Sequence, residues 1–139
     1  MRLSTFPALA AITLLMAACT TTPVTPPPVT TASGLVYQSL KEGSGTPPAA
    51  TDTVKVHYRG TFMDGKEFDS SYKRGEPTEF PLNRVIKCWT EGVQMIKPGG
   101  KARLTCPPAI AYGEKGAGGG VIPPNATLQF EVELISVTK

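Results

Sequence analysis

Two long stretches in which apolar and polar residues alternate constrain the fold of this chain more than any other feature. In Thr53 to Gly60, the residues Val54, Val56 and Tyr58 alternate with polar side chains, and Ala126 to Val137 extends the same pattern. Because side chains two residues apart share one face of a strand, this period predicts strands with one buried and one solvated face. The 14 glycines and 14 prolines favour the many turns that such a sheet needs.

One segment between these strands has the period of a helix. Trp89, Val93 and Ile96 recur at helical spacing within residues 85–96. A Pro-Gly-Gly sequence at residues 98–100 would end that helix. Shorter strands are predicted at residues 34–40, at 67–71 after an Asp-Gly turn, and at 101–107 with Ala102, Leu104 and Cys106 inward. One short helix against an antiparallel sheet is an α+β fold.

The length and charge of the chain exclude several classes of function. The 139 residues suit one domain, which we place at residues 33–139, where the composition changes abruptly. A formal charge of +3 without a basic stripe argues against nucleic acid as a partner. The three cysteines lack zinc-site spacing, and the single histidine, His57, is predicted to face solvent, so no metal site is expected.

The first 18 residues have the outline of a secretory signal. Arg2 precedes an apolar run from Phe6 to Met16, which is too short for a comfortable transmembrane helix of roughly 20 residues. The run ends before Cys19 in a sequence that resembles a bacterial lipobox, which implies a lipid-modified N-terminal cysteine and a membrane anchor. The alternative is an ordinary signal cleaved near Ala18, with an unmodified cysteine.

Residues 19–32 are predicted to be a tether. The stretch TTTPVTPPPVTT within them has no charge and little bulky apolar surface, so it cannot offset the entropy of folding. Its prolines favour an extended chain of about 3.1 Å per residue. Thr20 stands where an aspartate often marks retention at the inner membrane, so we expect a cell-envelope protein, lipid-anchored at the outer membrane.

Five short motifs in the folded part resemble those of one known family in order and spacing. They are Val56-His57-Tyr58-Arg59-Gly60, Phe68-Asp69-Ser70-Ser71, Val85-Ile86-Lys87-Cys88-Trp89, Ala111-Tyr112-Gly113 and Ile122-Pro123-Pro124-Asn125-Ala126-Thr127-Leu128. Together they cover residues 34–139 and are similar to FKBP-type peptidyl-prolyl cis/trans isomerases. The likeness is greatest to the bacterial branch of macrophage infectivity potentiator-like and periplasmic isomerases.

This resemblance implies an antiparallel sheet of five or six strands wrapped around one short helix, with an apolar pocket between them. The residues that it places in the pocket are Tyr58, Phe68, Asp69, Phe80, Val85, Ile86, Trp89, Tyr112, Ile122 and Phe130. Without the resemblance, the aromatic residues among them could equally be core. Asp69 fits a core poorly, because a carboxylate after a buried Phe68 would need a partner, such as Arg59 or the Tyr58 hydroxyl.

The resemblance also implies the activity and the roles of particular residues. The Ile86 N–H and the Tyr112 hydroxyl would bind substrate carbonyls, and Asp69 would face the reacting carbonyl. Phe68 completes the predicted catalytic set, and no cofactor is implied. Proline-containing polypeptides of the cell envelope are the expected substrates. A module that binds such peptides without turnover is the main alternative, whereas a structural lipoprotein would not need the pocket and a hydrolase would need a nucleophile motif that is absent.

The sequence departs from the family pattern at two places. Cys88 replaces the glycine usual before the pocket tryptophan. The Gly-rich tip at residues 116–120 is longer than in compact members and lacks a bulky side chain at the pocket edge. The resemblance also implies macrolides of the rapamycin type as ligands, and the altered tip means that their affinity does not follow from the resemblance.

Cys88 and Cys106 are predicted to form a disulfide. Export removes the chain from the reducing cytosol, and lipidation of Cys19 leaves these two cysteines as a pair. The helix rises by about 12 Å after Cys88, and the strand to Cys106 returns by about 16 Å, so the two residues reach similar heights. The alternative is two buried free thiols, and a Cα–Cα distance above about 7 Å would exclude the bridge.

Overall fold

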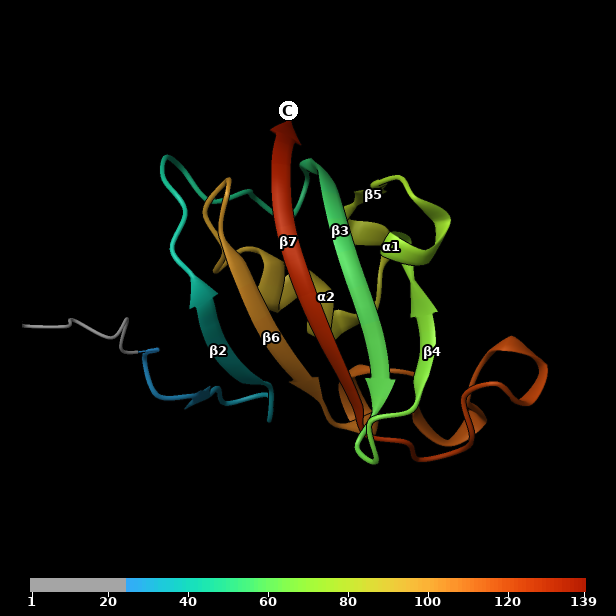
Figure 1. Ribbon diagram of the computed structural model, residues 1–139. Coiled ribbons are helices and arrows are strands. Elements are labelled where there is room, and N and C mark those ends of the chain that lie inside the picture. Colours follow the sequence, from blue (N-terminus) through green and yellow to red (C-terminus); the bar gives the residue numbers. More distant parts are fainter. Residues whose placement is uncertain (1–24) are drawn as a thin grey trace, which may run out of the picture.

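The two stretches with alternating residues form the centre of one antiparallel sheet in the computed structural model, which describes residues 25–139 (Figure 1). Strands β3 (Thr53–Phe62) and β7 (Leu128–Thr138) pair along their length. Val54, Val56 and Tyr58 are buried, with exposed fractions of 0%, 0% and 6%, which confirms the predicted alternation. The predicted signal at residues 1–18 and the lipid site at Cys19 lie outside the described residues.

The remaining strands extend this sheet on both sides. Their bounds are β1 (Val29–Thr30), β2 (Val36–Lys41), β4 (Glu67–Ser70), β5 (Thr78–Pro81) and β6 (Lys101–Cys106). The order is β1-β2-β6-β7-β3-β4. Strand β5 pairs with residues 53–56 of β3, and β4 pairs with residues 59–61 of the same strand. Within the described residues the sheet thus has seven strands where five or six were expected, because the short strands β1 and β5 were not predicted.

Helix α2 (Lys87–Val93) lies across one face of the sheet (Figure 1). It is shorter than the predicted segment 85–96, because Ile86 is extended and the chain turns after Gln94. Trp89, Val93 and Ile96 are all buried, as their spacing predicts. Gly92 brings the helix close to β6: a Cβ atom at Gly92 would lie 2.8 Å from the Leu104 methyl groups.

The two cysteines of the folded part meet between this helix and β6. The Cα atoms of Cys88 and Cys106 are 5.7 Å apart, within the limit for a disulfide, and their sulfur atoms are bonded in the structure. Both side chains are fully buried. The bridge therefore joins the residue before Trp89 to the inward face of the sheet.

A short helix that the sequence did not predict follows β4. Helix α1 (Ser71–Arg74) begins at Ser70, whose side chain accepts a hydrogen bond from the Lys73 N–H, and ends at Gly75, which has a positive φ of 76°. It covers part of the outer face of β3. His57 is consequently half-buried and does not simply face solvent as predicted: its ring stacks on Tyr72 with 4.7 Å between centroids.

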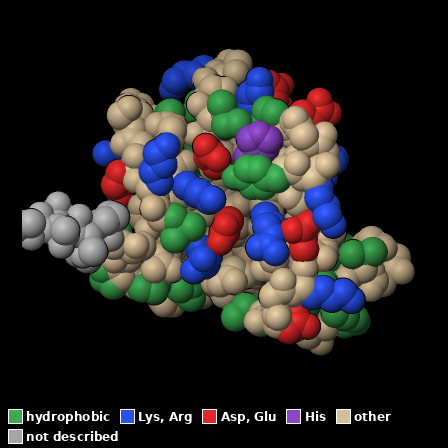
Figure 2. Space-filling view, in the orientation of Figure 1, with side chains coloured by type: hydrophobic (Ala, Val, Ile, Leu, Met, Phe, Trp, Pro, Cys, Tyr) green, Lys and Arg blue, Asp and Glu red, His purple; other side chains and the backbone are tan. Residues whose placement is uncertain are grey.

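The outer face of the sheet carries ion pairs of mixed sign, and Figure 2 shows acidic and basic side chains interspersed on it. Arg59 bonds to Glu67 at 2.6 Å, and Arg103 bonds to Glu131 at 2.9 Å. On this face, each of these basic side chains is thus paired with a neighbouring acidic one.

At the other edge, β1 and β2 form a tight hairpin. Val29 pairs with Tyr37, and Thr30 pairs with Val36. The Thr31 N–H donates to the Leu35 carbonyl at 2.8 Å and closes the turn. The sheet thus begins before residue 33.

Across residues 25–139, helices are all too short or too polar to cross a bilayer.

Candidate active site

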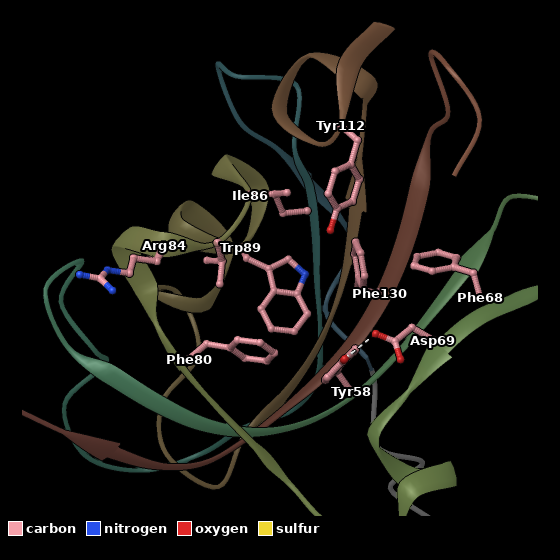
Figure 3. Close-up of a pocket in the computed structure, with 10 residues that line it drawn as sticks. Tyr58, Phe68, Asp69, Phe80, Arg84, Ile86, Trp89, Tyr112 and Phe130 are labelled. Atoms are coloured by element: carbon pink, nitrogen blue, oxygen red, sulfur yellow. Dashed lines mark hydrogen bonds between the residues drawn. The ribbon is translucent and has the colours of Figure 1, made fainter. Parts of the chain in front are cut away.

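A cavity of about 480 Å³ opens between α2 and the sheet (Figure 3). This size is typical of pockets that bind small ligands or single side chains of a partner. The lining residues are Tyr58, Phe68, Asp69, Phe80, Arg84, Val85, Ile86, Trp89, Tyr112 and Phe130. They come from β3, β4, β5, β7, α2 and two connecting segments, so the fold as a whole assembles the pocket.

The floor of the cavity is the indole ring of Trp89, which is 4% exposed. The rings of Tyr58, Phe80 and Phe130 surround it with centroid distances of 5.1, 5.4 and 5.4 Å. All three contacts are close to perpendicular, which is a favourable arrangement for aromatic rings. The indole Nε1 is buried and has no hydrogen-bond partner within residues 25–139. The floor is therefore an apolar surface fixed by edge-to-face packing.

Phe68 forms one wall of the cavity. Its ring packs against Phe130 at 5.6 Å and against Phe62 at 5.0 Å. Gly60 makes this packing possible, since a Cβ atom there would lie 2.6 Å from the Phe68 ring and 2.9 Å from Phe130. Phe68 is half-buried where full burial was expected, and it presents apolar surface to the cavity.

Asp69 is held at the polar end of the cavity by two side chains. The Tyr58 hydroxyl donates to one of its oxygens at 2.5 Å, and the Arg74 guanidinium donates to the other at 2.7 Å. The predicted partner Tyr58 is therefore present. The suggested partner Arg59 is wrong: it lies on the outer face of β3, where it pairs with Glu67. Arg74 was missed because α1, which carries it, gave no sequence signal.

These contacts keep the Asp69 carboxyl ionised. Burial alone would raise its pKa, but the hydrogen bonds from Tyr58 and Arg74 outweigh that effect, and the pKa falls below its ordinary value. The pKa of Tyr58 is raised, first by burial and then by its hydrogen bond to Asp69. The cavity thus has a fixed carboxylate at one end, supported by a neutral phenol and a guanidinium.

Tyr112 lies at the rim, opposite the floor, with its hydroxyl directed toward the cavity in Figure 3. The residue is 38% exposed. Burial, and then the negative charge of Asp69, raise the pKa of its hydroxyl, so the group remains a hydrogen-bond donor at neutral pH.

Ile86 lies between the rim and the floor, immediately before α2. Its carbonyl accepts the first hydrogen bonds of the helix, from the N–H groups of Trp89 and Thr90. Its own N–H makes no hydrogen bond with residues 25–139, so it is available to a bound molecule. Val85 precedes it and adds apolar surface to the lining.

Nine of the ten residues predicted for the pocket line this one cavity, and Ile122 does not. Ile122 is 7% exposed and forms an isolated bridge with Ala117, which holds it in the base of the Gly-rich loop. Arg84 lines the cavity and was not predicted, although it directly precedes a motif residue, Val85. No group of three or more His, Cys, Asp or Glu side chains suited to a metal ion occurs in the described part of the chain.

Comparison with known proteins identifies the class. The sequence model of the family described as FKBP-type peptidyl-prolyl cis-trans isomerase matches residues 44–135. An antiparallel sheet with one main helix and an aromatic pocket is also the arrangement expected for that family. The chain belongs to the FKBP-type peptidyl-prolyl cis-trans isomerases, which confirms the resemblance seen in its motifs.

Two bacterial relatives show the extent of the match. The chain is 56% identical over 108 residues to FkpA of Escherichia coli K12, covering 78% of this chain and 39% of the relative. It is 51% identical over 110 residues to the isomerase Mip of Coxiella burnetii, covering 79% and 47%. The chain therefore spans less than half the length of these two relatives.

Solved structures confirm the α+β fold. The crystal structure of FkpA from Escherichia coli matches with a TM-score of 0.76 and 54% identity, over 80% of this chain and 51% of that one. A peptidyl-prolyl cis-trans isomerase of Pseudomonas syringae matches with a TM-score of 0.75 and 40% identity, over 81% of both chains.

Proposed function

We propose that this chain accelerates cis/trans isomerisation of Xaa-Pro bonds in exported polypeptides by noncovalent binding in the aromatic cavity. The observation that carries the proposal is the combination of an apolar floor, Trp89, with a fixed carboxylate, Asp69, at one end of the same cavity. Membership of the family supports it independently.

The physical basis is the difference between the planar and the twisted amide. Rotation about the X-Pro bond has a barrier of about 18–20 kcal/mol because it breaks the conjugation between carbonyl and nitrogen. The planar amide has the larger dipole and loses more on leaving water than the twisted form does. A proline ring seated on Trp89, away from solvent, would therefore approach its transition state with a lower barrier.

Four residues have proposed roles around that proline. Asp69 faces the carbonyl of the residue before proline and stabilises its rotated dipole. The Ile86 N–H and the Tyr112 hydroxyl bind substrate carbonyls, and Phe68 excludes water from the reacting bond. The unpaired N–H of Ile86 and the neutral hydroxyl of Tyr112 support these assignments. No step requires a cofactor.

The proposed place of action is the cell envelope, through a lipid on Cys19 and a tether formed by the part of residues 19–32 that precedes β1 (Val29–Thr30). The apolar leader and the lipobox-like sequence support this arrangement. The disulfide between Cys88 and Cys106 is consistent with an oxidising compartment. Incorporation of labelled palmitate by the wild-type chain, and its loss in Cys19→Ala, would test the anchor. An unlabelled wild-type chain would show that the leader is an ordinary signal.

The activity is tested by magnetisation exchange between the cis and trans forms of a proline peptide. The full chain should increase the exchange rate at catalytic concentration without metal or nucleotide. A folded chain that binds the peptide and leaves the exchange rate unchanged would instead be a binding module. Competition by a macrolide of the rapamycin type, measured on the same exchange, would show whether that ligand class enters the cavity.

A further inference from the structure

Arg84 differs from the other arginines that the structure describes. Arg59, Arg74 and Arg103 each pair with a carboxylate, at 2.6, 2.7 and 2.9 Å. Arg84 makes no ion pair and no side-chain hydrogen bond with any of residues 25–139, and it lines the cavity. Its positive charge is therefore available to a ligand.

Arg84 lies across the floor from the polar end of the cavity. It is the last residue of the short 3₁₀ segment η1 (Leu82–Arg84), two residues before Ile86. In Figure 3 the Trp89 ring separates it from Asp69. A chain that crosses the floor from the Asp69 end would consequently pass Ile86 and leave beside Arg84.

The cavity has an excess of positive charge at this exit. Its lining contains two ionised side chains, Asp69 and Arg84. Asp69 is already compensated by Arg74, which pairs with it from α1. The remaining charge, one positive guanidinium at the Arg84 end, is not balanced by any described partner.

We infer that Arg84 makes the enzyme prefer Xaa-Pro substrates with Asp or Glu in the first two positions after the proline. The inference rests on the proposed function, which places the carbonyl before proline at Asp69 and the proline ring on Trp89. The residues that follow proline then run toward Arg84, and each adds at most about 3.6 Å of chain. A carboxylate there would meet the unpaired guanidinium, whereas the same residue before proline would lie at the Asp69 end.

The expected preference is moderate because Arg84 is exposed. An ion pair at such a rim changes kcat/KM by about two- to fivefold. Salt should weaken it, since about 1 M ionic strength shortens the screening length to about 3 Å. An apolar effect of the longer side chain would not respond to salt in this way.

The test compares two pairs of peptides by exchange measurements with the full chain. In one pair Glu or Gln directly follows the proline, and in the other pair Glu or Gln lies two residues before it. The first pair should give a Glu-to-Gln ratio of kcat/KM of about two to five, and the second a ratio near or below one. If the chain accelerates neither peptide, the proposed function fails. Equal acceleration of Glu and Gln peptides leaves that function standing and overturns this inference.

Substitutions at Arg84 decide whether this residue is responsible. The ratio for the first pair should fall to about one in Arg84→Gln, fall below one in Arg84→Glu, and be retained in Arg84→Lys. Lys41→Gln, which removes an exposed cation outside the cavity lining, is the matched control and should keep the wild-type ratio. Lys87, an exposed cation three residues after Arg84, is the nearby alternative source of positive charge. A preference that persists in Arg84→Gln, or that is lost in Lys87→Gln with Arg84 intact, would overturn the assignment.

Discussion

The floor and the rim of the cavity are built from different kinds of residue. On the floor, Trp89, Tyr58 and Phe130 are 4%, 6% and 4% exposed and also belong to the hydrophobic core. On the rim, the Asp69 side chain is 41% exposed and Tyr112 is 38% exposed. Floor side chains are thus held by the packing that folds the domain, whereas Asp69 at the rim is held by hydrogen bonds from Tyr58 and Arg74.

This difference separates two contributions to activity. A change on the floor removes buried aromatic surface, so it acts on stability and on the pocket together. A change at the rim acts mainly on how strongly the pocket stabilises the twisted Xaa-Pro bond of a bound substrate. Variants of floor and rim residues should therefore differ in how much they change the free energy of unfolding and how much they change kcat/KM.

Trp89→Ala should have the largest effect. It removes a buried indole in contact with three aromatic rings and should lower the free energy of unfolding by about 3–5 kcal/mol. Urea denaturation measures this loss, and exchange experiments below the transition should show little remaining catalysis. Trp89→Phe keeps much of the packing and should lose less of both. A fully stable Trp89→Ala would show that the floor is not part of the core.

Removal of the disulfide should come second. Cys88→Ala with Cys106→Ala releases a loop of 18 residues, which corresponds to about 3 kcal/mol of unfolding free energy. Because the bridge anchors the helix beneath the floor, the loss should appear in stability more than in kcat/KM at low temperature. Wild-type protein unfolded in reductant is the control. Two free thiols in the unfolded, exported protein without reductant would contradict the predicted bridge.

Asp69→Asn tests the rim. It replaces the carboxylate by a neutral amide of nearly the same shape, and kcat/KM should fall about tenfold, or about 1.4 kcal/mol of transition-state stabilisation. Stability should change by less than about 1 kcal/mol, because the side chains of the Arg74–Asp69 pair are 45% and 41% exposed. Glu67→Gln makes the same chemical change on the outer face and should leave kcat/KM unchanged. An active Asp69→Asn would remove Asp69 from the proposed mechanism.

The smallest effect concerns pH. Since the pKa of Asp69 is lowered from 3.8 in the folded state, its ionised form favours folding above the unfolded pKa, and this contribution is lost as pH falls through the folded pKa. The difference in urea midpoint between wild type and Asp69→Asn should therefore be constant near neutral pH and shrink below about pH 4. A difference that grows on acidification would show that the carboxylate is destabilising.

Much of the fold could be predicted because period alone distinguishes its main elements. The alternation in β3 and β7 requires one buried face, and the spacing of Trp89 and Val93 requires a helix. The shorter elements gave no such signal. Strand β5 has only four residues and ends in a proline, and α1 has only four residues, which is too few to establish a period.

The site was predictable where its residues lie on those periodic elements or in family motifs. Tyr58 and Trp89 fall into both groups, and Phe130 lies on the alternating strand β7. Arg74 could not be found in this way, because its contact with Asp69 depends on a single turn of α1. Ile122 belongs to a family motif but does not line this cavity, because it lies in a Gly-rich loop whose path is set by positive-φ residues such as Gly116.

The hairpin of β1 and β2 has a consequence for mechanical load. Only two residue pairs join β1 to β2, whereas five pairs join β2 to β6. A pull from the N-terminal side of β1 reaches the open end of this hairpin first and separates Val29 from Tyr37, then Thr30 from Val36. Under the proposed lipid anchor, tension between membrane and domain would lengthen the tether by peeling off β1, while β2, β6 and the cavity keep their arrangement.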